Sequence, residues 1–145
     1  ELFALLESVK VHVINPDNIQ EHIRKKFVMI SATATGTSYF NQTVGDALRD
    51  HPREMRALIE ELCSLFQSLG YDLGEDAVER TIERQTFMIP TSTSSMHVDF
   101  MAGRPTELEN LTGYVVRTAR AHGLRLPTYE KMYEALASQP YPPAL

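Results

Sequence analysis

The sequence predicts an all-α domain that begins with a short extended segment. Apolar residues recur at spacings of three and four along several segments, which is the period of an amphipathic helix. The strongest of these segments lies between Pro52 and Gly70, the residue types that favour helix starts and helix ends. With 145 residues, of which 43% are hydrophobic, the chain has the size of one domain with one core. We expect about six or seven helices in it.

The first fifteen residues are expected to lie apart from the helical body. Leu2, Leu5, Leu6 and Val9 have helical spacing and resemble the end of a helix, and Val11, Val13 and Ile14 then suggest a short strand. The run Asn15-Pro16-Asp17-Asn18 breaks the chain. Because the sequence starts in the middle of a pattern and without methionine, we expect a fragment, with a tail over 1–15 and a helical domain over 16–145.

A long helix is predicted from about Ile19. Its apolar stripe consists of Ile23, Phe27, Ile30 and Ala34. Threonines at 33, 35 and 37 together with Gly36 are poor helix formers, so we expect this helix to weaken or kink there, and a further break at 41–45.

Two more helices follow. The segment from Pro52 to Gly70 has a nearly unbroken stripe that predicts a core helix: Met55, Leu58, Ile59, Leu62, Leu65, Phe66 and Leu69. The next helix is predicted over about 75–89, with Val78, Ile82 and Ile89 on its apolar side, Arg80, Glu83 and Arg84 on its wet face, and Pro90 at its end. The lone Cys63 has no histidine or glycine-rich turn beside it, so we expect a buried and unreactive thiol.

The stretch 94–116 concentrates polar and reactive residues before a helix start. Thr106 is expected to be the N-cap and Glu109 the third helical residue of a capping box, in which each side chain binds the other's backbone N–H. Glu107 then falls in the first turn, where the helix dipole favours a carboxylate. Two interpretations are open at this point: a capped junction with a solvated Glu107, or a functional cleft.

The C-terminal part predicts two helices and a tail. Leu108, Leu111, Val115, Ala119 and His122 should face inward until Gly123 ends the first helix. Pro127 begins the second, whose buried face should consist of Tyr129, Met132, Tyr133 and Leu136. The proline-rich run 139–143 cannot continue a helix.

Charge and composition exclude several classes of partner. The net charge is -5, with 14 Lys+Arg against 19 Asp+Glu, so neither nucleic acid nor an anionic membrane is an expected partner. No apolar run has the length needed to span a bilayer, and a single cysteine indicates the cytoplasm. His97 has no second ligand at metal spacing, so no metal site is expected.

The stretch 94–116 resembles part of the C-terminal domain of the ketopantoate reductase (2-dehydropantoate 2-reductase) family. The matching residues are Ser94-Ser95-Met96, Asp99, Gly103-Arg104 and Thr106-Glu107, without insertion or deletion. The resemblance implies an all-α catalytic domain like those of ketopantoate reductase and 6-phosphogluconate dehydrogenase. It also implies that residues 1–15 are the tail and linker of a preceding dinucleotide-binding domain, whose GxGxxG loop is not in this sequence.

The resemblance also assigns roles to individual residues. The family's essential lysine matches Lys26, which would act as general acid, although the adjacent Lys25 leaves a one-residue shift open. Ser95 matches a substrate-binding serine, and Asn41 would assist it in binding the substrate. Glu107 matches the glutamate that completes the catalytic site, where it would bind the polar end of the substrate or orient the lysine. Asp99 and Arg104 are expected behind the site, pairing with each other or contacting the ligand. Arg24 and Ile30 depart from the family, which has tryptophan and a substrate-binding asparagine there, and this puts the identity of the substrate in question.

The implied activity is reduction of ketopantoate or a related 2-keto acid to the 2-hydroxy acid. NADP would be the cofactor and would be bound mainly by the missing Rossmann domain, and the assembled protein could be a homodimer. The alternative from another class is a free-standing helical interaction domain that dimerises through an apolar face and performs no chemistry.

Overall fold

The structure, a computed structural model, describes residues 18–139 and the isolated positions 6 and 9. Over this part of the chain it contains α-helices and one π-helical turn, with no strand. The elements are α2 (Ile19–Phe40), α3 (Val44–Asp50), α4 (Pro52–Ser68), α5 (Ala77–Thr86), α6 (Ser95–Met101), η1 (Glu109–Gly113), α7 (Tyr114–Ala121) and α8 (Pro127–Ala137). The all-α prediction is confirmed. The extended segment predicted at 11–14 and most of the helix predicted at 2–9 lie outside the described residues.

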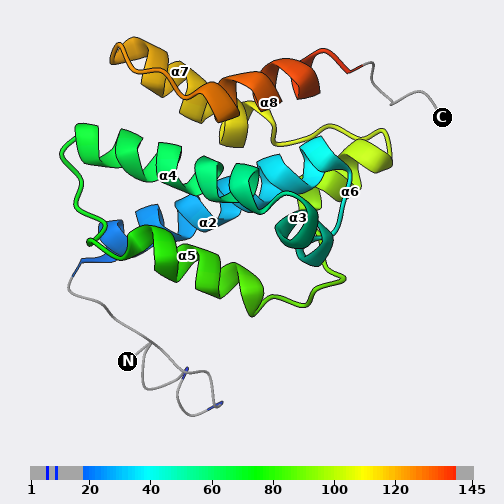
Figure 1. Ribbon diagram of the computed structural model, residues 1–145, viewed down its shortest axis with the longest axis horizontal. Coiled ribbons are helices and arrows are strands. Elements are labelled where there is room, and N and C mark those ends of the chain that lie inside the picture. Colours follow the sequence, from blue (N-terminus) through cyan, green and yellow to red (C-terminus); the bar gives the residue numbers. More distant parts are fainter. Residues whose placement is uncertain (1–5, 7–8, 10–17, 140–145) are drawn as a thin grey trace.

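Helix α2 is the centre of the fold. It contacts α3, α4, α5, α6, α8 and η1. Figure 1 shows α2 crossing behind α4, with α7 and α8 on one side of this pair and α5 on the other. The second half of α2 is therefore enclosed, and every residue from Ser31 to Ser38 is buried.

The predicted stripe and kink of α2 are wrong in two respects. Ile23 and Ile30 are exposed, at 52% and 38%, because the first half of the helix packs Phe27 and Val28 against the core and leaves the face of Ile23 and Ile30 uncovered. The helix is also unbroken from Ile19 to Phe40. Gly36 is compatible with it because a Cβ there would overlap the Met55 side chain of α4, so the glycine permits close helix packing.

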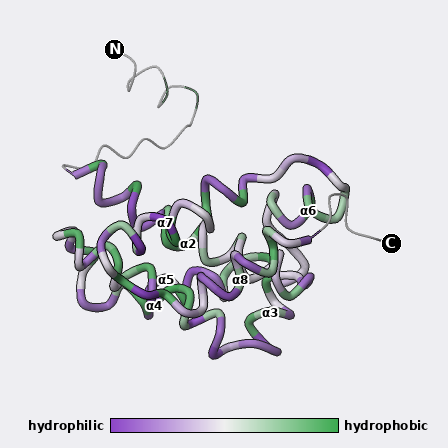
Figure 2. Tube along the Cα trace, turned by 90° about the horizontal axis from the view of Figure 1, so that it is seen from above, coloured by the Kyte–Doolittle hydropathy of each residue, from purple (hydrophilic) through white to green (hydrophobic). Residues whose placement is uncertain are grey.

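Helix α4 supplies the main core, as its stripe predicts. Six of its seven predicted residues are buried, and they pack with Val28, Ala32, Val115, Tyr129 and Met132 from other helices. The hydropathy colouring in Figure 2 shows apolar and polar residues alternating along the helices rather than forming long blocks. This alternation is the pattern expected of amphipathic helices around a shared core.

Helix α5 packs Val78 and Ile82 against the core, partly buried, as predicted, but it is shorter than predicted. It ends at Thr86, and its buried residues are Ala77, Thr81 and Gln85, whereas Ile89 is 71% exposed. The segment that follows α5 is bound to the start of α3. Val44 and Gly45 donate backbone N–H bonds to the carbonyls of Ser92 and Pro90, both at 2.9 Å. A Cβ on Gly45 would lie 2.8 Å from Pro90, so glycine is required for this approach.

The junction around residue 106 does not form the predicted capping box. Thr106 Oγ1 accepts a bond from the Leu108 N–H at 3.4 Å, but the Glu109 carboxylate binds Arg117 and the Tyr133 hydroxyl instead of the Thr106 N–H. The first turn is a π-helix, in which Gly113 N–H donates to Leu108 O at 2.8 Å. His122, predicted to face inward, is exposed because α7 ends at Ala121 and Gly123 takes a φ of +69°.

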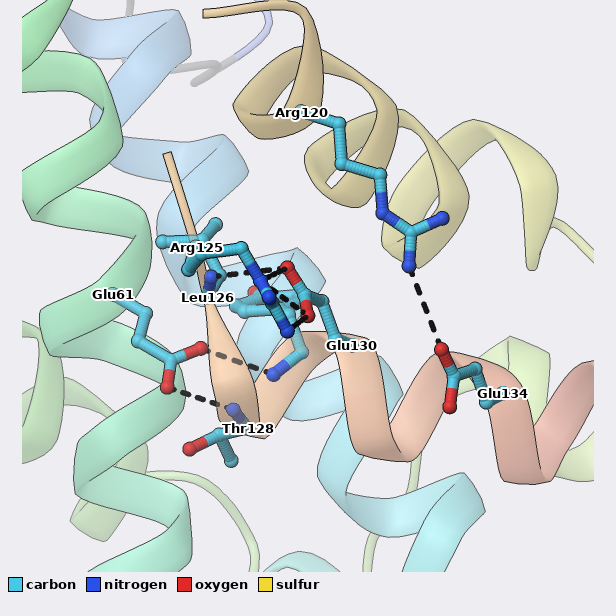
Figure 3. A network of polar contacts seen from close by, with 8 residues as sticks. Glu61, Arg120, Arg125, Leu126, Thr128, Glu130 and Glu134 are labelled. Carbon is cyan, nitrogen blue, oxygen red and sulfur yellow. Dashed lines mark hydrogen bonds and ion pairs between the residues drawn. The ribbon is translucent and has the colours of Figure 1, made fainter. Parts of the chain in front are cut away.

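Helix α8 is fixed by carboxylates at its start (Figure 3). Glu61 of α4 accepts the backbone N–H groups of Thr128 and Tyr129 at 2.8 and 3.0 Å, and Arg125 binds Glu130 at 2.6 Å. The two bonds to Glu61 occupy backbone N–H groups that a helix start leaves unpaired. None of the helices in residues 18–139 is both long and apolar enough to cross a membrane.

Candidate functional site

A cavity of about 250 Å³ lies between α2, the start of α6 and the segment before η1. Most of its wall is apolar, and three hydroxyls and one carboxylate interrupt it. The lining residues are Met29, Ile30, Thr33, Ala34, Met88, Ser94, Ser95, Glu107 and Leu111. The predicted residues Ser95 and Glu107, twelve positions apart in the sequence, are therefore brought to the same cavity.

The two serines of this cavity have different hydrogen bonds. Ser94 is the N-cap of α6, where its Oγ accepts the His97 N–H at 3.1 Å and also bonds with Thr37 Oγ1 at 2.8 Å. Ser95 is exposed, and no hydrogen bond of its side chain forms within the described residues. Ser94 thus serves the fold, while the Ser95 hydroxyl is available to a ligand.

Glu107 lies at the edge of the cavity with an exposed side chain. Its backbone carbonyl accepts the N–H groups of Asn110 and Leu111 at 3.0 and 2.9 Å, which fixes the residue at the start of the π-helical turn. No ion pair of this carboxylate occurs among residues 18–139. Glu107 can therefore accept a hydrogen bond from a bound molecule.

Lys26 lies in an adjoining groove between α2 and α5. This groove is about 470 Å³ in volume, and Met29, Ala77 and Thr81 form part of its wall. The other lining residues are basic: His22, Lys25, Lys26, Arg80 and Arg84. Met29 lines both the groove and the cavity. Residues 26, 29, 30 and 33 share one face of the helix, so the groove and the cavity meet one helical turn from Lys26.

The structure distinguishes between the two adjacent lysines. Lys25 forms an ion pair with Glu21 one turn earlier on α2. Lys26 is exposed and has no ion-pair partner in the part of the chain that the structure describes. Its ammonium group is therefore free to meet a ligand in the groove, although it is less enclosed than the cleft lysine we expected.

Asn41 lies away from this site. It is the C-cap of α2 in the left-handed conformation (φ 52°), fifteen positions beyond Lys26 and thus about 22 Å along the helix axis. Its Oδ1 bonds with His97 Nε2 at 2.8 Å, and His97 Nδ1 bonds with Thr93 Oγ1 at 2.6 Å. Asn41 reaches the cavity only indirectly, since His97 in turn binds Ser94.

His97 is a satisfied, neutral histidine rather than a metal ligand. Oδ1 can only accept, so Nε2 carries the proton and Nδ1 accepts from Thr93. Burial lowers the pKa of His97, which favours the same neutral form. No group of three or more potential metal ligands occurs among the described residues.

Asp99 and Arg104 form the pair that stabilises the turn after α6. Arg104 Nε donates to Asp99 Oδ1 at 2.8 Å, and the Arg104 N–H also binds the Asp99 carbonyl at 2.9 Å. Neither residue lines the cavity or the groove. Their contribution is the conformation of the chain that leads to Glu107.

Cys63 is half-buried, and burial raises the pKa of its thiol to about 11. A thiol with this pKa is almost entirely protonated at neutral pH. It is therefore a poor nucleophile, in agreement with the sequence.

Several residues of the cavity were not found by sequence reasoning. Met29 and Thr33 could have been, because they lie three and seven positions from Lys26 on the same helical face. Ser94 belongs to the motif found in the sequence, but its place in the cavity was not predicted. Met88 could not have been found, since the segment between α5 and α6 is placed by long-range bonds to α2 and α3.

The chain is similar to known proteins in sequence and in fold. Residues 18–139 match the family described as "Ketopantoate reductase PanE/ApbA C terminal". The chain is 29% identical over 133 residues to the 2-dehydropantoate 2-reductase of Salmonella typhimurium, covering 92% of the chain and 44% of that relative.

Solved structures show the same similarity. A crystal structure of 2-dehydropantoate 2-reductase from Porphyromonas gingivalis W83 has a TM-score of 0.76 at 36% identity, over 94% of the chain and 41% of the other protein. A dimeric ketopantoate reductase from Staphylococcus aureus has a TM-score of 0.78 at 24% identity, and the similarity covers 91% of the chain and 46% of the other protein. The chain thus spans less than half the length of these relatives.

Proposed function

Because the chain belongs to the ketopantoate reductase family, we propose that it is the substrate-binding and catalytic domain of an NADPH-dependent reductase. The substrate would be ketopantoate or a related 2-keto acid, and the product the 2-hydroxy acid, as in pantothenate biosynthesis. One observation carries the proposal: the basic groove of Lys26 and the cavity of Ser95 and Glu107 meet at Met29.

The charges of the two spaces orient a 2-keto acid. Its carboxylate is repelled by Glu107 and attracted by the basic groove, where His22, Lys26 and Arg84 are free of ion pairs within the described residues. Its substituent then enters the apolar cavity between Ile30, Met88 and Leu111. The keto carbon is left between them, one helical turn from Lys26.

Reduction creates negative charge on the keto oxygen, and this oxygen needs a proton. Lys26 would donate it as general acid. Ser95 would hydrogen-bond the substrate, and Glu107 would bind its polar end. Asn41 would assist from a distance by fixing His97 and thereby the start of α6, and the pair Asp99–Arg104 would hold the loop of Glu107.

NADPH would supply the hydride and leave as NADP⁺. The basic and open groove beside Lys26 suits the edge of an anionic cofactor, but the sequence holds no GxGxxG loop for its phosphates. We assign that loop to a dinucleotide-binding domain preceding residue 16, with residues 1–15 as its tail and linker. We further propose a cytoplasmic protein that assembles as a homodimer, as the Staphylococcus aureus relative does.

The test is steady-state oxidation of NADPH by the complete protein with ketopantoate and with other 2-keto acids. We expect turnover with at least one of them. No turnover with any 2-keto acid, together with dimerisation of this domain alone, would favour the alternative of a helical interaction domain.

A further inference from the structure

The cavity contains a hydroxyl to which no role has yet been assigned, that of Thr33. The residue lies on α2 in the middle of the cavity wall and is 5% exposed. It is three positions beyond Ile30 and on the same face as Lys26. Its side chain is therefore part of the wall that a substituent bound in the cavity would meet.

Gln85 of α5 determines the direction of the Thr33 hydroxyl. The side-chain amide of Gln85 is 1% exposed and donates from Nε2 to Thr33 Oγ1 at 3.0 Å. Because the oxygen accepts this bond, the hydroxyl proton remains for a second partner. No acceptor for it occurs within the described residues, and Gln85 Oε1 is itself buried without a partner.

The other threonines of α2 do not share this property. Thr37 donates to the Thr33 carbonyl at 2.8 Å, and Thr35 bonds with Thr112 at 2.8 Å. Neither of them lines the cavity. Ser38 Oγ on the same helix is also buried without a partner, but Ser38 does not line the cavity either. Thr33 therefore differs from all three in that its free hydroxyl proton lies in the cavity wall.

We propose that Thr33, oriented by Gln85, is a specificity-determining residue that selects 2-keto acids with a hydroxyl on the substituent. This inference rests on the proposed function. Thr33 donates to the oxygen of that hydroxyl, and Glu107, in the same cavity, accepts its proton. The two contacts satisfy the hydroxyl as donor and as acceptor, which the apolar remainder of the wall cannot do.

A pair of substrates that differ in one group tests the proposal. Ketopantoate carries the terminal hydroxyl, and trimethylpyruvate is the same 2-keto acid without it. In the complete protein, Thr33→Val should lower kcat/KM for ketopantoate by about 5- to 10-fold, mainly through KM, and change that for trimethylpyruvate less than about twofold. Thr33→Ser, which keeps the hydroxyl, should restore the wild-type ratio of the two substrates.

Two further variants control for stability. Thr35→Val removes a buried hydroxyl outside the cavity and should leave the substrate ratio unchanged. Thr33→Val could fail to fold because Gln85 is left unpaired, and in that case the double variant Thr33→Val/Gln85→Met removes both polar groups. It should show the same decrease in kcat/KM for ketopantoate relative to trimethylpyruvate.

The outcomes separate the two proposals. An unchanged substrate ratio in a folded Thr33→Val or in the double variant overturns the role of Thr33, while the wild-type turnover still supports the reductase. Absence of wild-type turnover with every 2-keto acid instead overturns the proposed function.

Discussion

At the scale of the residue, the choice between Lys25 and Lys26 shows how one position changes a function. The two ammonium groups are identical, but Lys25 is paired with Glu21 and Lys26 shares a helical face with Met29 and Thr33. A proton donor must be free to approach the substrate, and only Lys26 meets this condition.

The first prediction concerns this pair in the complete protein. Lys26→Ala should lower kcat by about 10²- to 10⁴-fold with a smaller effect on KM, because it removes the proposed proton donor of the chemical step. Lys25→Ala is the matched control and should have little effect. Steady-state kinetics in which Lys25→Ala is inactive and Lys26→Ala is normal would show that the assignment is shifted by one residue.

The second prediction concerns the groups at the cavity. Ser95→Ala and Glu107→Gln should raise KM more than they lower kcat, because each removes a partner of a polar substrate group and leaves that group unpaired. Measured KM values equal to those of the unmodified protein in both variants would remove these residues from the binding site.

At the level of the element, the start of helix α8 is stabilised by a residue of another helix. Helix α8 has no side-chain cap of its own, and Glu61 of α4 accepts two of its N–H groups. Glu130 adds a second contact, because it binds the Arg125 guanidinium just before the helix (Figure 3). The helix is thus attached to the fold by charge as well as by Tyr129 and Met132 in the core.

The third prediction is a pH dependence at this helix. The Arg125 guanidinium holds the pKa of Glu130 below its ordinary 4.5. A lowered pKa in the folded state means that the stabilisation is complete above pH 4.5 and disappears as the pH falls through the lower, folded value. Glu130→Gln should therefore lower Tm at pH 7 and have little effect near the folded pKa. Thermal melts with a pH-independent difference in Tm would contradict this.

At the scale of the whole molecule, the site is assembled around α2 from segments far apart in the sequence. Helix α2 supplies Lys26 and Thr33, the loop after α5 supplies Met88, and the segments around α6 and η1 supply Ser95 and Glu107. Since α2 also contacts most other helices, the fold and the site depend on the same element.

The fourth prediction concerns the cofactor. Calorimetry of the 145-residue chain alone should show no tight binding of NADPH, and the chain alone should not reduce ketopantoate, because its sequence has no glycine-rich phosphate loop. Micromolar affinity of this chain for NADPH would assign the cofactor site to the helical domain itself.

Sequence reasoning alone predicts the all-α class, the core helix α4, most of the buried face of α8, and the helix ends marked by Pro52, Gly123 and Pro127. The sequence also carried the motif from Ser94 to Glu107 that indicated the family. These features are local, because periodicity and helix-end chemistry depend on neighbours within a few residues.

The contacts between polar groups, in contrast, depend on the tertiary structure. It exposed Ile23 and Ile30, turned Glu109 toward Arg117 and Tyr133, bound Asn41 to His97, and joined Gln85 to Thr33 across 52 positions of sequence. Burial of a face depends on which helix covers it, and the partner of a polar group depends on which segment folds beside it. The local period encodes neither the burial of a face nor the partner of a polar group. The groove at Lys26 and the position of the Thr33 hydroxyl in the cavity can therefore be recognised only in the folded molecule.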